Sequence, residues 1–204
     1  FPSVDATQIM EMARNARNMM GDTARGLAVL EDMVKGLVTL QSTKGTDVAG
    51  SEISRMLKGI DNLGQNSAGM LGINNTKQII DGMIKAVQIE GKDLDVGKLF
   101  DFARRAKIAG PGLSTDFIFG TAPAMMQDMT AEGFGAALSS AYKSFVVGDR
   151  SQAGKTYMRE QERMGLRTGL TLNKRGGVEN KGEFVGSDLL ASNPFEWVKQ
   201  HLMP

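Results

Sequence analysis

The sequence predicts a mainly α fold: a compact multi-helix domain of short helices, with an irregular Gly-rich arm or short hairpin near the C-terminus. Three observations predict it. Apolar residues recur mostly at helical spacing, glycines or helix caps follow the apolar stretches, and the chain changes character after Gly165. The 204 residues suffice for one domain or for two small ones. No stretch approaches the roughly 20 apolar residues of a membrane span, so we expect no membrane contact.

Residues 1–91 are predicted to form an N-terminal helical region of four short helices. Their apolar stripes begin at Ile9, Leu27, Ile53 and Ile79. A glycine follows each stripe, where the left-handed backbone that glycine readily adopts suits a helix end. These glycines are Gly21, Gly45, Gly64 and Gly91. Asn75 followed by Gln78 resembles a capping box, which predicts that the fourth helix begins there.

Residues 92–165 are predicted to form a helical core. Asp95 is placed to cap its first helix, and Ser114 or Thr115 is placed to cap the next. Pro123 falls inside that second helical stretch. Because proline lacks the N–H group of a helix interior, it either starts a new helix there or kinks one.

Residues 166–204 are predicted to form a Gly-rich basic arm, followed by a C-terminal helix that packs back on the core. Five glycines and three basic residues are interleaved in the arm. Asn193 then supplies a helix cap, Pro194 takes the first helical position, and Glu196 places an acid in the first turn. This is a strong start for a last, amphipathic helix.

Composition excludes several kinds of active site. The chain has no cysteine, which excludes disulfides, thiolate metal sites and cysteine nucleophiles. Its single histidine, His201, excludes any site that needs two imidazoles. The net charge of +1 gives no overall electrostatic reason to expect a nucleic-acid or membrane partner. Composition does not state the function beyond these exclusions. From these exclusions, together with the motifs discussed below, we predict a non-enzymatic chain with no catalytic residue, no cofactor and no metal.

The segment from Gly148 to Thr156 comes close to a phosphate-binding loop. Such a loop needs a glycine, four further residues and then Gly-Lys-Ser/Thr, so that successive backbone N–H groups surround the phosphates. The residues at 154–156 satisfy the end of the motif, but Asp149 stands where its first glycine belongs. We interpret the segment as a solvated turn. The alternative is a nucleotide-binding or hydrolytic domain that uses Gly154-Lys155-Thr156.

Two groups of acidic residues imitate sites. Asp93 and Asp95 resemble the start of a calcium loop, but the twelfth position of that loop is Arg104 rather than an acid. Pairs such as Asp128 with Glu132 arise freely among 23 acidic residues, and we interpret them as exposed helix faces.

The basic arm offers a further alternative, a helical nucleic-acid-binding module. Its members are Arg163, Arg167, Lys174, Arg175 and Lys181. No aromatic residues are interleaved with them to stack on bases, so specific recognition is not expected. Loose, non-specific contact with the DNA backbone stays open.

From residue 91 onward, short motifs follow one another in a distinctive order. They are Phe102-Ala103-Arg104, Leu113-Ser114-Thr115-Asp116-Phe117-Ile118-Phe119, Pro123-Ala124-Met125-Met126-Gln127, Gly133-Phe134-Gly135-Ala136-Ala137-Leu138, Tyr142, Gly148, Met164-Gly165-Leu166 and Gly186-Ser187-Asp188-Leu189-Leu190. The most telling is the ending, Asn193-Pro194-Phe195-Glu196-Trp197-Val198. In this order the motifs resemble the conserved region of bacteriophage tail tape-measure proteins, the tail length determinants.

The resemblance implies a virion structural protein of a phage or prophage, made in the host cytoplasm and placed in the tail lumen. It helps to determine tail length during assembly and is expelled ahead of DNA. Implied partners are further copies of the chain and the tail tube, tail tip or tail assembly chaperone proteins. The family has no catalytic residues to carry over to this segment. The candidate packing and interaction positions are Phe117, Phe119, Pro123, Tyr142, Pro194, Phe195, Trp197 and Val198. In a single domain, we expect the last three of these to contact the aromatic residues among the first four.

Glycine content limits the part that this segment plays. A ruler is best built as one extended helix, which gains about 1.5 Å per residue. Each of the 25 glycines costs about 1 kcal/mol in a helix interior, so the chain is predicted to fold back on itself, apart from any measuring rod. Its 14 methionines are expected in the core, or alternatively in a self-association face. Because the chain starts at Phe1, without an initiator methionine, we interpret it as a segment of a longer protein.

Overall fold

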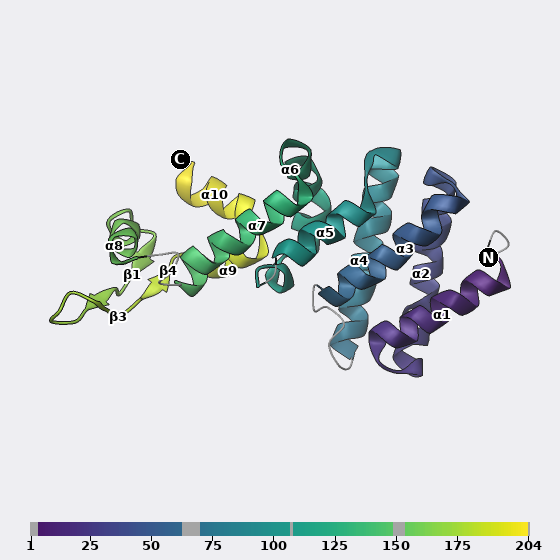
Figure 1. Ribbon diagram of the computed structural model, residues 1–204, viewed down its shortest axis with the longest axis horizontal. Helices are drawn as coiled ribbons and strands as arrows, with labels where there is room; N and C mark the ends of the chain where they lie inside the picture. Colours follow the sequence, from purple (N-terminus) through teal and green to yellow (C-terminus); the bar gives the residue numbers. More distant parts are fainter. Residues whose placement is uncertain (1–3, 63–69, 107, 149–153, 204) are drawn as a thin grey trace.

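The computed structural model describes residues 4–62, 70–106, 108–148 and 154–203, and these residues are 78% helical. The prediction of a mainly α fold is therefore confirmed. Figure 1 shows the helices α1 to α4 at one end of the molecule, and α8 with the strands at the other end.

The described part of the chain contains long helices first and shorter elements later. The first five helices are α1 (Ala6–Met20), α2 (Thr23–Lys44), α3 (Thr46–Asn62), α4 (Met70–Glu90) and α5 (Val96–Ala106). The later helices are α6 (Ala122–Asp128), α7 (Ala131–Tyr142), α8 (Lys155–Arg163), α9 (Ser187–Ser192) and α10 (Pro194–Leu202). Two 3-10 turns are η1 (Gly91–Asp93) and η2 (Gly110–Gly112), and two π-helical turns are η3 (Phe117–Thr121) and η4 (Lys143–Val147). The strands are β1 (Arg167–Thr168), β2 (Thr171–Leu172), β3 (Val178–Asn180) and β4 (Glu183–Phe184).

Local signals at the helix ends account for several of these boundaries. The carboxylate of Asp95 accepts a hydrogen bond of 3.0 Å from the backbone N–H of Lys98, as a helix cap does. Asn193 caps α10 in the same way, with a bond of 3.1 Å from the N–H of Glu196. Gly21 follows α1 with a left-handed φ of 82°. The glycine predicted at residue 64 lies outside the described residues.

Helix α4 begins at Met70, five residues before the predicted start, so the capping box at Asn75 and Gln78 is wrong. The reason is tertiary packing. Thr76, which is fully buried, donates a hydrogen bond of 3.7 Å to the sulfur of Met20 on α1. The added first turn is packed as well, since Ile73 lies against the hydrophobic core, and this packing overrides the local capping signal. The helices α2 and α4, with 22 and 21 residues, are also longer than the short helices that were predicted.

Glycines inside helices mark places where two helices touch closely, a role that differs from the predicted helix ends. A Cβ at Gly26 of α2 would lie 2.7 Å from the backbone nitrogen of Arg17 on α1. A Cβ at Gly135 of α7 would lie 2.5 Å from the carbonyl oxygen of Phe102 on α5. At both crossings a larger residue would push the two backbones apart.

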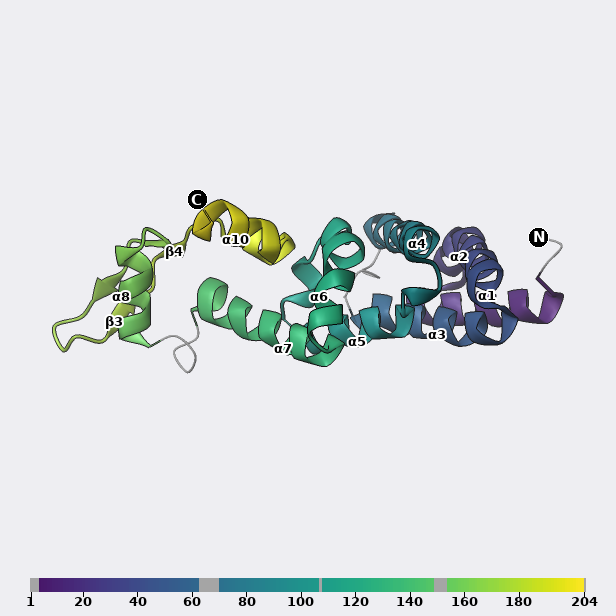
Figure 2. The ribbon, with the colours of Figure 1, turned by 90° about the horizontal axis from the view of Figure 1, so that it is seen from above.

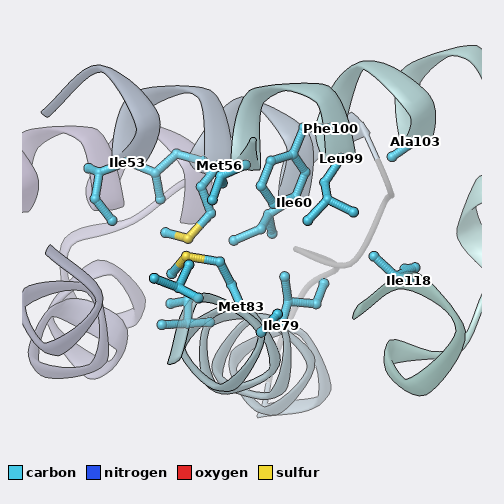
Figure 3. Close-up of a cluster of buried hydrophobic side chains, with 14 of the residues drawn as sticks. Ile53, Met56, Ile60, Ile79, Met83, Leu99, Phe100, Ala103 and Ile118 are labelled. Carbon is cyan, nitrogen blue, oxygen red and sulfur yellow. The ribbon is translucent and has the colours of Figure 1, made fainter. Parts of the chain in front are cut away.

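The larger hydrophobic cluster joins α1 through α7 and contains several methionines, in keeping with the predicted core role. Figure 3 shows Met56 and Ile60 of α3 facing Met83 of α4, with Phe100 of α5 beside them. Three phenylalanines continue the cluster beyond this view. Phe134 of α7 stacks on Phe102 with ring centroids 5.2 Å apart and lies 6.2 Å from Phe117.

A second, smaller cluster forms around β4 and the last two helices. Its buried residues are Leu166, Phe184, Leu190 and Trp197. Strand β1 pairs antiparallel with β4, and β2 pairs antiparallel with β3. The predicted arm is therefore a hairpin made of two short, successive antiparallel ladders. Helix α9 packs against η4 and against α10, which is the yellow helix at the C-terminus in Figure 1.

The π-helical turn η4 connects the two clusters. It continues α7 directly, yet Leu138 and Tyr142 pack on the larger cluster, whereas Phe145 and Val146 pack on the smaller one. A π-helical turn places its hydrogen bonds between residues i and i+5, so it rotates the side chains that follow relative to an α-helix. The change of turn therefore lets one helix serve two cores. It ends at Gly148, whose φ is 60°.

Candidate interaction site

An aromatic cluster occupies the centre of the C-terminal part. The ring of Trp197, which is 1% exposed, lies 5.2 Å from Phe184 and 6.1 Å from Phe145. Its indole N–H donates a hydrogen bond of 2.9 Å to the carbonyl oxygen of Val185. Pairs at these separations contribute beyond the area they bury, and the satisfied N–H removes the cost of burying it. These contacts bring η4, β4 and α10 together.

Arg167 of β1 binds the elements around this cluster to one another. The side chain is 2% exposed. Its Nε donates to the side-chain oxygen of Gln161 on α8 at 2.8 Å, and its Nη1 donates to the carbonyl oxygen of Lys181 at 2.9 Å. The guanidinium carbon also lies 5.6 Å from the centre of the Phe184 ring. Burial lowers the pKa of Arg167 from its ordinary value, although the guanidinium stays charged.

Two cations close the end of η4. The last carbonyl groups of a helix have no partner within it, and cationic side chains can satisfy them. Nη2 of Arg167 donates to the carbonyl oxygen of Phe145 at 2.9 Å, and Nζ of Lys181 donates to that of Val147 at 3.1 Å. Both residues were predicted to belong to a basic arm available for DNA. In the structure the side chains of both residues donate hydrogen bonds to backbone carbonyl groups of η4.

Gly186 lies against α10 with a left-handed φ of 68°. A Cβ there would lie 2.7 Å from Nε2 of His201 and 2.9 Å from Nε1 of Trp197. The rings of Trp197 and His201 are 5.1 Å apart. Glycine therefore permits both the turn and the approach of the helix, and His201 has a packing contact here.

Four of the candidate positions lie in or beside the larger cluster. Phe117 is 1% exposed, and Tyr142 is partly buried at the edge. Phe119 rests on α4, where a Cβ at Gly82 would lie 2.6 Å from its ring. Pro123 lies in the first turn of α6, directly after η3, which agrees with the prediction that it starts a new helix.

The other four candidate positions lie on α10. Pro194 takes the first helical position, Trp197 and Val198 pack in the smaller cluster, and Phe195 is 48% exposed. The predicted contact with the aromatic residues of the first group is therefore wrong. Trp197 contacts Phe145 and Phe184 instead, because η4 turns Phe145 toward it. A different link exists nearby, since the N–H of Ser114 donates to the carbonyl oxygen of Ser192 at 2.9 Å.

Helix α10 also presents an unpaired apolar face. Phe195 and Leu202 are 48% and 44% exposed, and they are seven residues apart, so they lie on the same side of the helix. Met203, just beyond the helix, is 62% exposed. This exposed face of α10, made of Phe195, Leu202 and Met203, borders the buried Trp197 and offers apolar area to another molecule.

The near-match to a phosphate-binding loop lies only partly within the described residues. Gly154 caps the start of α8, and Lys155 and Thr156 are exposed. The residues before it, 143–147, form a π-helical turn, whereas a phosphate-binding loop follows a strand. The geometry gives this alternative no support.

Two residues of the acidic near-matches, Asp95 and Glu132, have partners within the protein. Asp93 lies in η1 and Asp95 caps α5. Glu132 lies 3.4 Å from Arg105. Among the described residues, no three side chains of His, Asp or Glu gather as a metal site requires. In the part of the chain that the structure describes, no helix is both long and apolar enough to span a membrane.

Residues that the sequence did not single out form a buried ion pair. Nζ of Lys44, at the end of α2, lies 2.9 Å from Oε1 of Glu52 on α3 and also donates to the carbonyl oxygen of Leu94. Both side chains are more than 90% buried. No signal in the sequence could have found this pair, because isolated Lys and Glu residues are usually exposed.

A groove runs between α1 and α3, with a volume of about 560 Å³. Its lining residues are mostly polar and carry both charges: Glu11, Arg14, Asn15, Asn18, Met19, Ser54, Leu57 and Lys58. This lining fits a polar partner, and none of the candidate positions lies in it.

Comparisons of the chain with protein-family models, with curated proteins and with solved structures each found no match. The features available for a functional interpretation are the two packed clusters, the polar groove and the exposed apolar face of α10.

Proposed function

We propose that this chain is a non-enzymatic structural segment of a phage or prophage tail tape-measure protein. It acts in tail assembly and length determination, by self-association or by docking to tail tube, tail tip or tail assembly chaperone proteins. It occupies the tail lumen and is expelled ahead of DNA.

The observation that carries the proposal is that the residues of the resembling motifs meet as packing surfaces. Phe102, Phe117 and Phe134 come from three different motifs, and the ring centroid of Phe134 lies 5.2 Å from that of Phe102 and 6.2 Å from that of Phe117. Gly135 gives α7 its close approach to α5. The ending motif supplies Trp197 to the smaller cluster. Motif residues that pack against one another suit a structural protein, because such a protein needs a defined shape and does not need a reaction centre.

The exposed face of α10 supports an assembly role. Phe195 and Leu202 expose large apolar side chains next to a well-packed core. Aromatic residues beside a rigid support are the usual anchors of protein interfaces, because they bury much area at a small entropic cost. This face is the docking surface that we assign to self-association or to a tail protein.

The test uses the phage or prophage that encodes the chain. Peptides of residues 1–204 are expected in purified tail particles by mass spectrometry. The double variant Phe195→Asp with Leu202→Asp is expected to lower the yield of complete tails in electron micrographs by about tenfold, because two buried charges oppose docking. The matched control is Ile89→Asp, at an exposed position of α4. Tails that lack the chain, or a double variant that assembles as well as the control, would overturn the proposal.

A further inference from the structure

Positive charge is concentrated in one part of the chain. Residues 154–181 contain seven Lys and Arg against three Glu, a net charge of +4, whereas the whole chain carries +1. The remaining residues therefore sum to −3. This distribution concerns α8 and the hairpin that follows it, at the end of the molecule far from the N-terminus (Figures 1 and 2).

Three of these seven cations have hydrogen-bond partners within the protein. Arg163 holds Glu160 through two hydrogen bonds of 2.6 and 2.9 Å, which keep the pKa of the Glu160 carboxyl below its ordinary value. Arg167 and Lys181 close the end of η4. The other four are exposed, and none forms an ion pair with another described residue. They form what we call the basic surface: Lys155, Arg159, Lys174 and Arg175.

Helix α8 and the hairpin bring these four residues together. Lys155 and Arg159 are four residues apart on α8, so they lie on one face with Cβ atoms about 5–6 Å apart. The Nζ of Lys155 lies 3.2 Å from the point that a Cβ on Gly176 would occupy. Gly176 follows Arg175 directly in the hairpin turn. The lysine of the helix therefore lies against the basic turn, which no spacing in the sequence indicates.

The turn itself is held in shape by Asn173. Its side-chain oxygen accepts hydrogen bonds from the N–H groups of Arg175 and Gly177, at 3.0 and 2.9 Å. Its carbonyl oxygen accepts a further bond of 2.8 Å from the N–H of Gly176. Lys174 and Arg175 are thus presented by a formed turn at the tip of a two-stranded ribbon, which extends beyond α8 in Figure 1.

These four cations have no ion-pair partner among the described residues and repel one another, and a polyanion relieves that repulsion while releasing its own counterions. We propose that the basic surface binds the phosphate backbone of duplex DNA, without preference for sequence. This inference goes beyond the proposed function and does not depend on it.

The chemistry of the surface favours DNA over an acidic protein. Residues 173–177 are Asn-Lys-Arg-Gly-Gly, which provides no apolar anchor of the kind that protein interfaces require. The surface also favours duplex DNA over single-stranded DNA. The hairpin segment 171–180 contains no aromatic residue on which unpaired bases could stack, and the ring of Tyr157 on α8 packs at a tilt of 38° against Phe145, with ring centroids 5.9 Å apart. A two-stranded ribbon also fits the major groove, which is about 12 Å wide.

The test measures binding of the 204-residue chain to a fluorescent 24-base-pair duplex of arbitrary sequence, by anisotropy over a series of salt concentrations. Four phosphate contacts predict a slope of about −3.6 for log K against log salt. The variants Lys155→Ala with Arg159→Ala, and Lys174→Ala with Arg175→Ala, are each expected to weaken binding about tenfold and to reduce the slope by about 2. Trp197 fluorescence checks that each variant retains the fold of the smaller cluster.

The matched control removes the same charge elsewhere. Lys35→Ala with Lys85→Ala, on α2 and α4, is expected to change the affinity less than twofold. Equal weakening by this control would overturn the proposal, because net charge would then explain the binding. The proposal would also fail if the duplex showed no saturable binding at low salt, if poly-L-glutamate bound as tightly, or if a single strand of equal length bound more tightly.

Discussion

The side chain of Arg167 donates a hydrogen bond of 2.9 Å to the carbonyl oxygen of Phe145, 22 residues earlier in the chain. A residue of strand β1 thereby closes the end of helix η4. The ring of Phe145 in turn contacts the ring of Trp197. Phe145 therefore links η4 to the hairpin through its backbone and to the last helix through its side chain.

Arg167→Ala is expected to lower the free energy of unfolding by about 3 kcal/mol, because it leaves three acceptors, one buried and two partly buried, without a donor. Trp197 is the only tryptophan, so urea denaturation followed by its fluorescence reports on this cluster directly. The control is Arg163→Ala, whose guanidinium is solvent-exposed and should leave the midpoint unchanged. An Arg167→Ala midpoint equal to that of the control would show that the hydrogen bonds contribute nothing.

Gly186→Ala is expected to destabilise the chain by about 3 kcal/mol. About 1 kcal/mol comes from the left-handed backbone, and the rest comes from the collision with Trp197 and His201. Gly165→Ala separates the two effects, since its φ is 72° but a Cβ there would meet nothing within 4 Å. It should cost about 1 kcal/mol alone. Thermal unfolding checks both, and equal losses would contradict the predicted collision.

Gly135→Ala is expected to cost about 2 kcal/mol, because the new methyl group must push α7 away from the backbone of α5. Gly50 on α3 provides the opposite case. It is exposed and a Cβ there would meet nothing within 4 Å, so Gly50→Ala should stabilise the helix by about 0.5–1 kcal/mol. Chemical denaturation gives both values. A stabilising Gly135→Ala would mean that this crossing does not need glycine.

Glu52→Ala is expected to cost about 3 kcal/mol, because the Lys44 ammonium stays buried without its partner. Replacing both residues together, as Lys44→Met with Glu52→Leu, should recover most of that loss, since no charge then stays buried. A double-mutant cycle by urea denaturation measures the coupling. Strictly additive single losses would show that the two side chains do not act as a pair.

Helix caps and glycine ends could be read from the sequence because each depends on a few neighbouring residues. Asp95 and Asn193 bind backbone N–H groups three residues away, and Gly21 ends α1 by its own φ. The start of α4 could not be read in this way. Its capping signal at Asn75 competes with the packing of Ile73, two residues earlier, against the larger cluster, and the packing prevails.

The candidate positions show the same division. Their place on helices followed from local patterns, as for Pro123 at the start of α6 and Pro194 at the start of α10. Their partners did not. Trp197 was expected beside Phe117 and lies instead beside Phe145 and Phe184, because a π-helical turn rotated Phe145 into reach.

By itself, the sequence determined the helical class, many helix ends and the hairpin, since propensities, caps and glycine conformations act over a few residues. Tertiary structure alone decided which basic residues are free. Arg167 and Lys181 face carbonyl groups of η4, while Lys155 meets the turn beside Arg175. Whether a basic side chain is exposed or hydrogen-bonded depends on residues that are distant in the sequence and close in space. A local sequence pattern does not contain this information.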